Sequence, residues 1–478
     1  MSESENKLKT GTWGLVGVTA LGAVMMSPAL GIFGNFGPMT LTAGSATPMI
    51  FLIALIVTLP TAICYAMVSK ELPSSGSAYT WLWEATNPLI GIWIGWLLFG
   101  FFIVVVFLQP LLFGLFFNDL LRLLGVEAGF SHFIISIVIS SSIVAFFSYR
   151  GGNVSEKGSL AGLIIQMVIV LALALTIVIS IGIREHLDLS DLIDSSSGAG
   201  MKGISQALIF GVLSFTGFNV IANMAEETKN PKKTIPRAII LSCVIVGIYW
   251  IIVSWAYLGA LPLSEITNAV KADSVPVVLI AKKFWGAGDI IIIITGMIAS
   301  LGVYLATILG SSRVIYSMAR DGVMASSLGK LNSRFLTPWK ALHVTFLLTF
   351  VFVLLPSAIF GIYFTYMWWG KAVVFFAVVI YIFVSIANPL FFYRYKKQNF
   401  SIFWNGIMGF ISLVVNLYLL YKAFFIDSWR NDWLNGKSVV AFAILWMTIG
   451  FFYVIYLKRR SPNLFMKKAS YLDTNNYK

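Results

Sequence analysis

The sequence predicts an all-α, multi-pass membrane protein with about twelve transmembrane helices. Hydrophobic residues make up 58% of the 478 residues and charged residues only 11%, whereas soluble domains carry roughly 25% charged residues. The mean hydropathy is +0.87. Apolar stretches recur along the whole chain, and many of them are long enough to cross a hydrocarbon core of ~30 Å, which needs about 20 helical residues. These observations leave no room for a soluble domain.

The predicted spans follow the apolar stretches in order. Two of them, 89–121 and 287–320, are longer than a vertical helix needs, and strong tilt explains the excess. A short interfacial helix is expected at 74–84, and 263–285 is expected to be a loop, with or without a surface helix. The predicted spans are 12–34, 47–69, 89–121, 131–149, 158–183, 203–226, 235–260, 287–320, 339–359, 363–393, 401–426 and 438–458.

The distribution of Lys and Arg predicts a cell-membrane protein with both termini in the cytoplasm. Cytoplasmic loops are enriched in these residues, and this orientation places 23 of the 33 on the inner side. The net charge of +13 therefore needs no nucleic-acid partner, and no basic run forms a groove-sized patch. Cys64 and Cys243 lie in apolar runs, where free thiols behave as small hydrophobes.

Signals for enzymatic chemistry or a cofactor are missing from the sequence. His132, His186 and His343 are scattered without metal-ligand spacing, and there is no nucleotide-binding Gly-x-x-x-x-Gly-Lys-Ser/Thr loop. We therefore expect no catalytic residues, no metal and no cofactor. The oligomeric state is not set by the sequence.

Two spans carry interruptions at mid-depth. In the first span Pro28 follows Ser27 between flanking glycines, and in the sixth the stretch 214–219 reads Ser-Phe-Thr-Gly-Phe-Asn. Proline removes a helix hydrogen bond, and irregular backbone inside a bilayer is tolerated only where it is buried or lines a cavity. The spans are equivalent if the chain holds two five-helix repeats plus two helices, and matched breaks indicate a midplane solute site. The alternative is that both breaks are ordinary kinks.

The broken helices would suit a zwitterion. A half-helix that begins after a break offers N–H groups and a positive dipole end to a carboxylate. A half-helix that ends at a break offers carbonyl oxygens to an ammonium group. The near absence of acidic residues deep in the spans agrees with this kind of recognition.

Three motifs give the chain a family resemblance. An aromatic-Gly-aromatic break in span six is followed by Glu226-Glu227-x-x-Asn230-Pro231 and Pro236-Arg237-Ala238. The other two are Glu71-Leu72-Pro73-Ser74-Ser75-Gly76-Ser77-Ala78-Tyr79 and Arg320-Asp321-Gly322. With these motifs the sequence resembles the amino acid–polyamine–organocation (APC) family of secondary transporters, from residue 12 to about residue 395.

The resemblance implies a LeuT-like fold and alternating access around a fixed site. Its inverted five-helix repeats would be 12–195 and 196–397, followed by two helices in 398–460, between cytoplasmic tails 1–11 and 461–478. Phe215 would be an outer lid, or else a core-facing Phe. The substrate-binding residues carried over by position are Val24, Met25, Met26, Ser27, Pro28, Ala29, Ser214, Phe215, Thr216, Gly217, Phe218 and Asn219.

The sequence departs from the family pattern at three places. Met26-Ser27-Pro28 stands where members commonly have Gly-Ser-Gly, Asn219 where many have an acidic residue, and Gln166 where some proton-coupled members have Lys. A lysine-based proton switch is therefore not supported.

Other polar residues in the spans have two interpretations each. Gln109 could reach the pocket or join helices. Glu226 and Glu227 could close an inner gate or form a solvated helix end. Lys371 could snorkel to the interface or face an outer vestibule. Hydroxyls in span eight are expected to bond their own backbone carbonyls.

The predicted function is secondary active transport of amino acids, by exchange or with protons as the coupling ion. The expected substrate is a neutral or aromatic amino acid, or a related small amine. A polyamine carrier is the alternative, weakened because Asn219 supplies no negative charge. A membrane enzyme or sensor would need a His, Asp or Glu cluster near one membrane face, and the sequence contains none.

Overall fold

The computed structural model of the protein describes residues 13–74, 76–150, 156–182, 200–320, 322–332, 335, 337–429 and 433–466. Within these residues the regular structure is helical, apart from an isolated β-bridge between Trp13 and Thr228. Eleven helical segments of this part are long and apolar enough to span a membrane. The first, Leu15–Glu71, has 57 residues. It covers predicted span 47–69 and all but the first three residues of predicted span 12–34, which is why eleven segments are counted where twelve spans were predicted.

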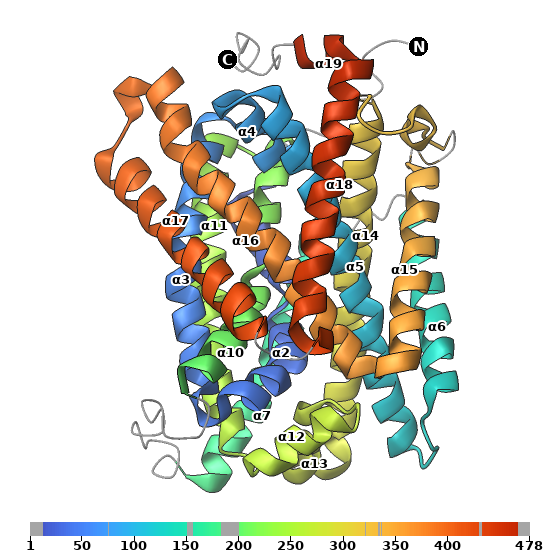
Figure 1. Ribbon diagram of the computed structural model, residues 1–478. Helices are drawn as coiled ribbons and strands as arrows, with labels where there is room; N and C mark the ends of the chain where they lie inside the picture. Colours follow the sequence, from blue (N-terminus) through green and yellow to red (C-terminus); the bar gives the residue numbers. More distant parts are fainter. Residues whose placement is uncertain are drawn as a thin grey trace.

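Figure 1 shows a bundle of long helices, with the short helices α4 and α19 at one end and α12 and α13 at the other. The helices are α1 (Leu15–Met26), α2 (Pro28–Ala43), α3 (Thr47–Glu71), α4 (Ala78–Ala85), α5 (Pro88–Leu123), α6 (Phe130–Tyr149), α7 (Glu156–Ile181), α10 (Gly200–Phe215), α11 (Pro231–Leu258), α12 (Leu263–Lys271), α13 (Pro276–Trp285), α14 (Asp289–Arg320), α15 (Trp339–Phe360), α16 (Ile362–Tyr395), α17 (Met408–Leu419), α18 (Ser438–Arg460) and α19 (Pro462–Met466). Shorter 3₁₀ segments are η2 (Gly44–Ala46), η3 (Phe218–Glu227), η4 (Gly286–Gly288), η5 (Ser326–Gly329) and η6 (Lys397–Asn399), and π-helical segments are η7 (Ile402–Ile407), η8 (Leu420–Ser428) and η9 (Trp433–Lys437).

Proline sets the start of several helices. Pro28, Pro88, Pro231 and Pro276 each occupy the first position of α2, α5, α11 and α13. At that position the missing N–H has no intrahelical partner to lose, and the fixed φ suits the helix. The chain can therefore begin a helix directly after a turn or a break.

The predicted elements largely match the observed ones. The two long spans are confirmed as α5, with 36 residues, and α14, with 32. The expected interfacial helix at 74–84 is α4, which begins at Ala78. The stretch 263–285, expected to be a loop with or without a surface helix, forms two helices, α12 and α13.

Both predicted interruptions are present. Helix α1 ends at Met26 and α2 begins at Pro28, and the residue between them, Ser27, has φ 47° and ψ 85°. Helix α10 ends at Phe215, and the span continues after Gly217 as the ten-residue 3₁₀ helix η3. Runs of 3₁₀ helix longer than three or four residues are uncommon, so the second half of this span is unusual in its geometry as well as interrupted.

The two broken spans pack against each other in opposite directions. Helix α1 contacts η3, and α2 contacts α10. The first half of one span therefore lies on the second half of the other, and this pairing brings both breaks to the same level of the bundle.

Candidate functional site

Gly217 brings the two breaks into direct contact. Its φ is +135°, and a Cβ placed on it would lie 2.9 Å from the carbonyl carbon and oxygen of Met25 and from the nitrogen of Met26. Only a residue without a side chain allows the backbone of one span to approach the other this closely. The local sequence at the second break therefore determines how the first break is packed.

The first break satisfies most of its own hydrogen-bonding groups. The N–H of Ser27 donates to the carbonyl oxygens of Ala23 (2.9 Å) and Val24 (3.0 Å). Ser27 then accepts two amides of the next half-helix, Leu30 N–H at its Oγ (3.4 Å) and Gly31 N–H at its carbonyl oxygen (2.8 Å). A helix N-terminus leaves its first amides without intrahelical partners. Here the Ser27 side chain takes up one of them, that of Leu30, while the Ser27 carbonyl oxygen accepts the first regular helix bond, from Gly31.

Neighbouring aromatic rings hold this break in place. Trp250 on α11 donates its Nε1–H to the carbonyl oxygen of Pro28 at 2.9 Å. The Trp250 ring packs edge-on against Phe215, with ring centroids 5.0 Å apart, and stacks on Phe51 at 5.6 Å. All three side chains are buried.

The second break is capped from within. Thr216 N–H donates to the carbonyl oxygens of Val212 (3.2 Å) and Leu213 (3.0 Å), and its Oγ1 also donates to Leu213 O at 2.6 Å. Asn219 uses its Oδ1 to accept the N–H of Gly217 at 3.1 Å. The Asn219 side chain therefore stabilises the non-helical backbone of the second break.

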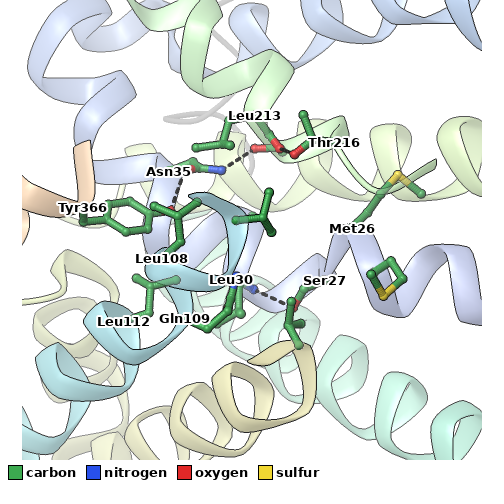
Figure 2. A pocket seen from close by; sticks show the side chains of 15 residues that line it. Met26, Ser27, Leu30, Asn35, Leu108, Gln109, Leu112, Leu213, Thr216 and Tyr366 are labelled. Atoms are coloured by element: carbon green, nitrogen blue, oxygen red, sulfur yellow. Dashed lines mark hydrogen bonds between the residues drawn. The ribbon is translucent and has the colours of Figure 1, made fainter. Parts of the chain in front are cut away.

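A cavity of about 60 Å³ lies beside the two breaks (Figure 2). One water-sized sphere needs roughly 10–15 Å³, so the cavity holds about four to six of them. Among the described residues, no acidic or basic side chain lines it. Its walls are Met25, Met26, Ser27, Leu30, Gly31 and Asn35 from the first span, Val105, Leu108, Gln109 and Leu112 from α5, Leu213, Ser214 and Thr216 from the sixth span, Val303 from α14 and Tyr366 from α16.

A buried hydrogen-bond network closes one wall of the cavity. Asn35 donates from Nδ2 to Ser214 Oγ at 2.8 Å, and its Oδ1 accepts the hydroxyl of Tyr366 at 2.8 Å. Ser214 Oγ in turn donates to the carbonyl oxygen of Phe210 at 3.0 Å. Figure 2 shows the bonds of Asn35 to both neighbours. The network ties α2, α10 and α16 together.

Gln109 faces the cavity from α5 and is only 6% exposed. Its Oε1 has no hydrogen-bond partner among the described residues. The other polar side chains of the cavity wall all have a partner: Ser27, Asn35, Ser214, Thr216 and Tyr366.

The structure brings six of the thirteen sequence-predicted binding residues to the cavity. Those that line it are Met25, Met26, Ser27, Ser214, Thr216 and Gln109. Those that do not line it are Val24, Pro28, Ala29, Phe215, Gly217, Phe218 and Asn219. Pro28, Phe215, Gly217 and Asn219 shape or support the breaks. Phe218 packs between Tyr65 and Tyr381, with both centroid distances 5.5 Å.

The gating residues are placed only in part. Phe215 is buried against Trp250, and its role as a lid stays a prediction. The side chains of Glu226 and Glu227 lie outside the described residues. Lys371 and Gln166 are partly buried and do not line the cavity.

The span-eight hydroxyls behave as expected. Ser300, Thr307, Ser311 and Ser312 on α14 each donate to a carbonyl oxygen three or four residues earlier. Back-bonding of this kind satisfies a hydroxyl inside a membrane helix without any ligand.

Sequence reasoning missed several cavity residues, chiefly Asn35 and Tyr366. Asn35 follows the first break by two helical turns on α2. It stands one residue beyond the predicted span 12–34, and an Asn in this apolar stretch was the available signal. Tyr366 had no comparable signal, because α16 is rich in aromatic residues throughout.

A comparison with protein families agrees with this geometry. The model of a family described as amino acid permease matches residues 13–463. The chain belongs to the amino acid permease family. This family lies within the APC superfamily, so the protein is a multi-pass membrane permease and not an enzyme.

Relatives of this permease are named for chemically different solutes. It is 26% identical to the branched-chain amino acid permease BcaP of Bacillus subtilis, over 71% of this chain and 73% of that protein. It is 27% identical to the methylthioribose transporter of the same organism, over 66% and 68%. It is 28% identical to the low-affinity putrescine importer PlaP of Escherichia coli K12, over 68% and 70%. Family membership therefore leaves the substrate undetermined.

Proposed function

We propose that this permease is a secondary active transporter of small neutral amino acids, which it carries by alternating access as an exchanger or a proton-coupled symporter. The observation that carries the proposal is the cavity at the meeting point of the two breaks. The described residues that line it are neutral polar and apolar, with no acidic or basic group among them. A zwitterion has no net charge, and such a site does not have to neutralise one.

The apolar walls support an aliphatic side chain. Leu30, Val105, Leu108, Leu112 and Leu213 are among the aliphatic side chains that line the cavity. A cavity for about four to six water-sized spheres suits a small solute. The relative whose name refers to branched-chain amino acids is consistent with this choice.

A polyamine fits the site less well. Moving an uncompensated ammonium group out of water is strongly unfavourable unless it is paired and hydrogen-bonded. The part of the chain that the structure describes places no carboxylate in the cavity wall to pair with a second cation. Putrescine, the solute named for one relative, would bring two cations into a site without a counter-charge.

We also propose that both termini are cytoplasmic and that 12–195 and 196–397 form the inverted repeats. Support comes from the 23 of 33 Lys and Arg residues that this orientation places inside. It also comes from the opposite directions of the two broken spans.

The test is counterflow in proteoliposomes that contain the purified full-length protein. Vesicles are loaded with unlabelled leucine, valine, phenylalanine, putrescine or methylthioribose, and entry of the corresponding radiolabelled solute is followed with and without a pH gradient. We expect leucine or valine to exchange above the level of protein-free vesicles. A gradient-driven increase indicates symport, and no increase indicates exchange. Exchange of putrescine or methylthioribose alone, without competition by any neutral amino acid, would overturn the proposal.

A further inference from the structure

We infer that Gln109 is a specificity-determining residue that recognises the substrate's amino group, accepting one of its N–H bonds at Oε1. The inference rests on the proposed function, because it names the part of an amino acid that one wall of the cavity binds. In this arrangement a side chain of α5, an unbroken helix, binds the ammonium group together with the ends of the two broken helices.

The periodicity of α5 directs Gln109 into the cavity. The residues of this helix that line the wall are Val105, Leu108, Gln109 and Leu112. Their spacing follows the i, i+3, i+4, i+7 pattern of one helical face. Gln109 is therefore the polar member of an otherwise apolar stripe that points at the substrate space.

A comparison of hydrogen-bond partners identifies Gln109 as the polar residue of the wall whose buried side-chain acceptor is unpaired. Asn35, Ser214 and Tyr366 bond to one another or to backbone. Thr216 donates to Leu213 O, and Ser27 accepts the N–H of Leu30. The Gln109 acceptor, in contrast, has no partner among the described residues. A buried acceptor without a partner loses the hydrogen bond that water would otherwise provide.

The first break favours a substrate orientation in which the ammonium group lies toward Gln109. Pro28 has no N–H, and Ser27 already binds the amides of Leu30 and Gly31. The second half-helix also presents the positive end of its dipole, which favours a carboxylate. A substrate whose carboxylate points at that end can place its ammonium group toward Gln109. Because the Gln109 amide is neutral, the pair adds no net charge to the site.

The experiment compares Gln109→Leu with the wild-type protein on two competitors. One is leucine, and the other is the des-amino acid with the same carbon skeleton and carboxylate. Apparent affinities are measured by competition against labelled leucine in detergent and in proteoliposomes. We expect Gln109→Leu to weaken leucine binding by about 10- to 100-fold, the range for a hydrogen bond to a charged group. Binding of the des-amino acid should change by less than about threefold, because that competitor has no N–H for Oε1 to accept.

A stability measurement separates recognition from structural support. Gln206→Leu is the matched control, because the Gln206 amide Nε2 donates to Ala423 O and Ser428 Oγ, both at 3.2 Å. Without substrate, Gln206→Leu should lower the melting temperature, whereas Gln109→Leu should leave it unchanged or raise it. Loss of an unpaired polar atom removes an unfavourable group, and loss of a paired one leaves two partners unsatisfied.

Three results would overturn the inference. Equal loss of affinity for both competitors would mean that Gln109 acts through shape. A melting temperature lowered as in Gln206→Leu would mean that the side chain supports the fold. Unchanged leucine affinity would mean that the amide does not touch the substrate. In each of these cases wild-type leucine exchange persists and the proposed function stands. If the wild-type protein neither binds nor exchanges any neutral amino acid, the proposed function and this inference fall together.

Discussion

Substitution of Gly217 tests whether the apposed breaks are required for transport. The residue has φ +135° and ψ −30°, a region that residues with a Cβ adopt only under strain. A Cβ at this position would lie 2.9 Å from backbone atoms of Met25 and Met26. These contacts are with backbone atoms, which have no alternative rotamer that could relieve them. One span therefore has to move away from the other.

The expected energetic cost is substantial. A residue forced into a sparsely populated backbone region loses about 1–3 kcal/mol, and an added group in a packed interior adds about 1–3 kcal/mol. Together these effects disfavour the apposed arrangement by about 2–6 kcal/mol. Even the lower figure corresponds to about a 30-fold change in its population.

The assay is the exchange rate in proteoliposomes, with expression and folding checked by size-exclusion chromatography. Gly217→Ala should reduce exchange at least tenfold, and Gly217→Leu should abolish it while the protein is still produced and folded. The matched control is Gly302→Ala on α14, where an added Cβ meets nothing within 4 Å. This control should stay within about twofold of wild type. If Gly217→Ala exchanges as fast as Gly302→Ala, the close approach of the two breaks has no role in transport.

The remaining predictions concern the groups that support the cavity. Tyr366→Phe removes the hydroxyl that bonds Asn35 at 2.8 Å and leaves a buried acceptor unpaired, which costs about 1–3 kcal/mol. We expect a lower melting temperature and faster labelling of a cysteine introduced at Leu213 by an impermeant reagent; equal labelling rates would show that the bond does not hold the wall closed. Asn219→Leu leaves the Gly217 N–H unpaired and should lower the melting temperature, whereas Asn219→Asp keeps an acceptor at the same place. A shift of substrate preference toward cations in Asn219→Asp would show that this side chain reaches the substrate.

The sequence predicted the spans and both interruptions because each leaves a local trace. Length and hydropathy locate a membrane helix, and Pro28 and Gly217 mark the places where a helix cannot continue. The second half of the sixth span was less predictable. It forms a 3₁₀ helix from Phe218 to Glu227, and a 3₁₀ and an α-helix place apolar residues at similar spacings over so few turns.

The cavity wall was only partly predictable, for a physical reason. The residues beside the breaks, such as Ser27 and Ser214, follow from the breaks themselves. The inward face of an unbroken span does not, because a helix that is apolar all round has no amphipathic pattern to show which side points inward. Gln109 was noticed as an isolated polar residue, and Asn35 and Tyr366 meet only when α2 and α16 pack together.

Several predicted binding residues instead support the breaks, and this division has a common cause. Backbone that leaves a helix inside a membrane must find partners within the protein. Asn219 and Ser27 supply them locally, and Trp250 supplies one from α11. Groups used in this way are not available to a ligand unless the break rearranges. A solute in the resting cavity therefore has to be held by dipoles, by shape and by any polar atom that is still unpaired, which is the position that Gln109 occupies.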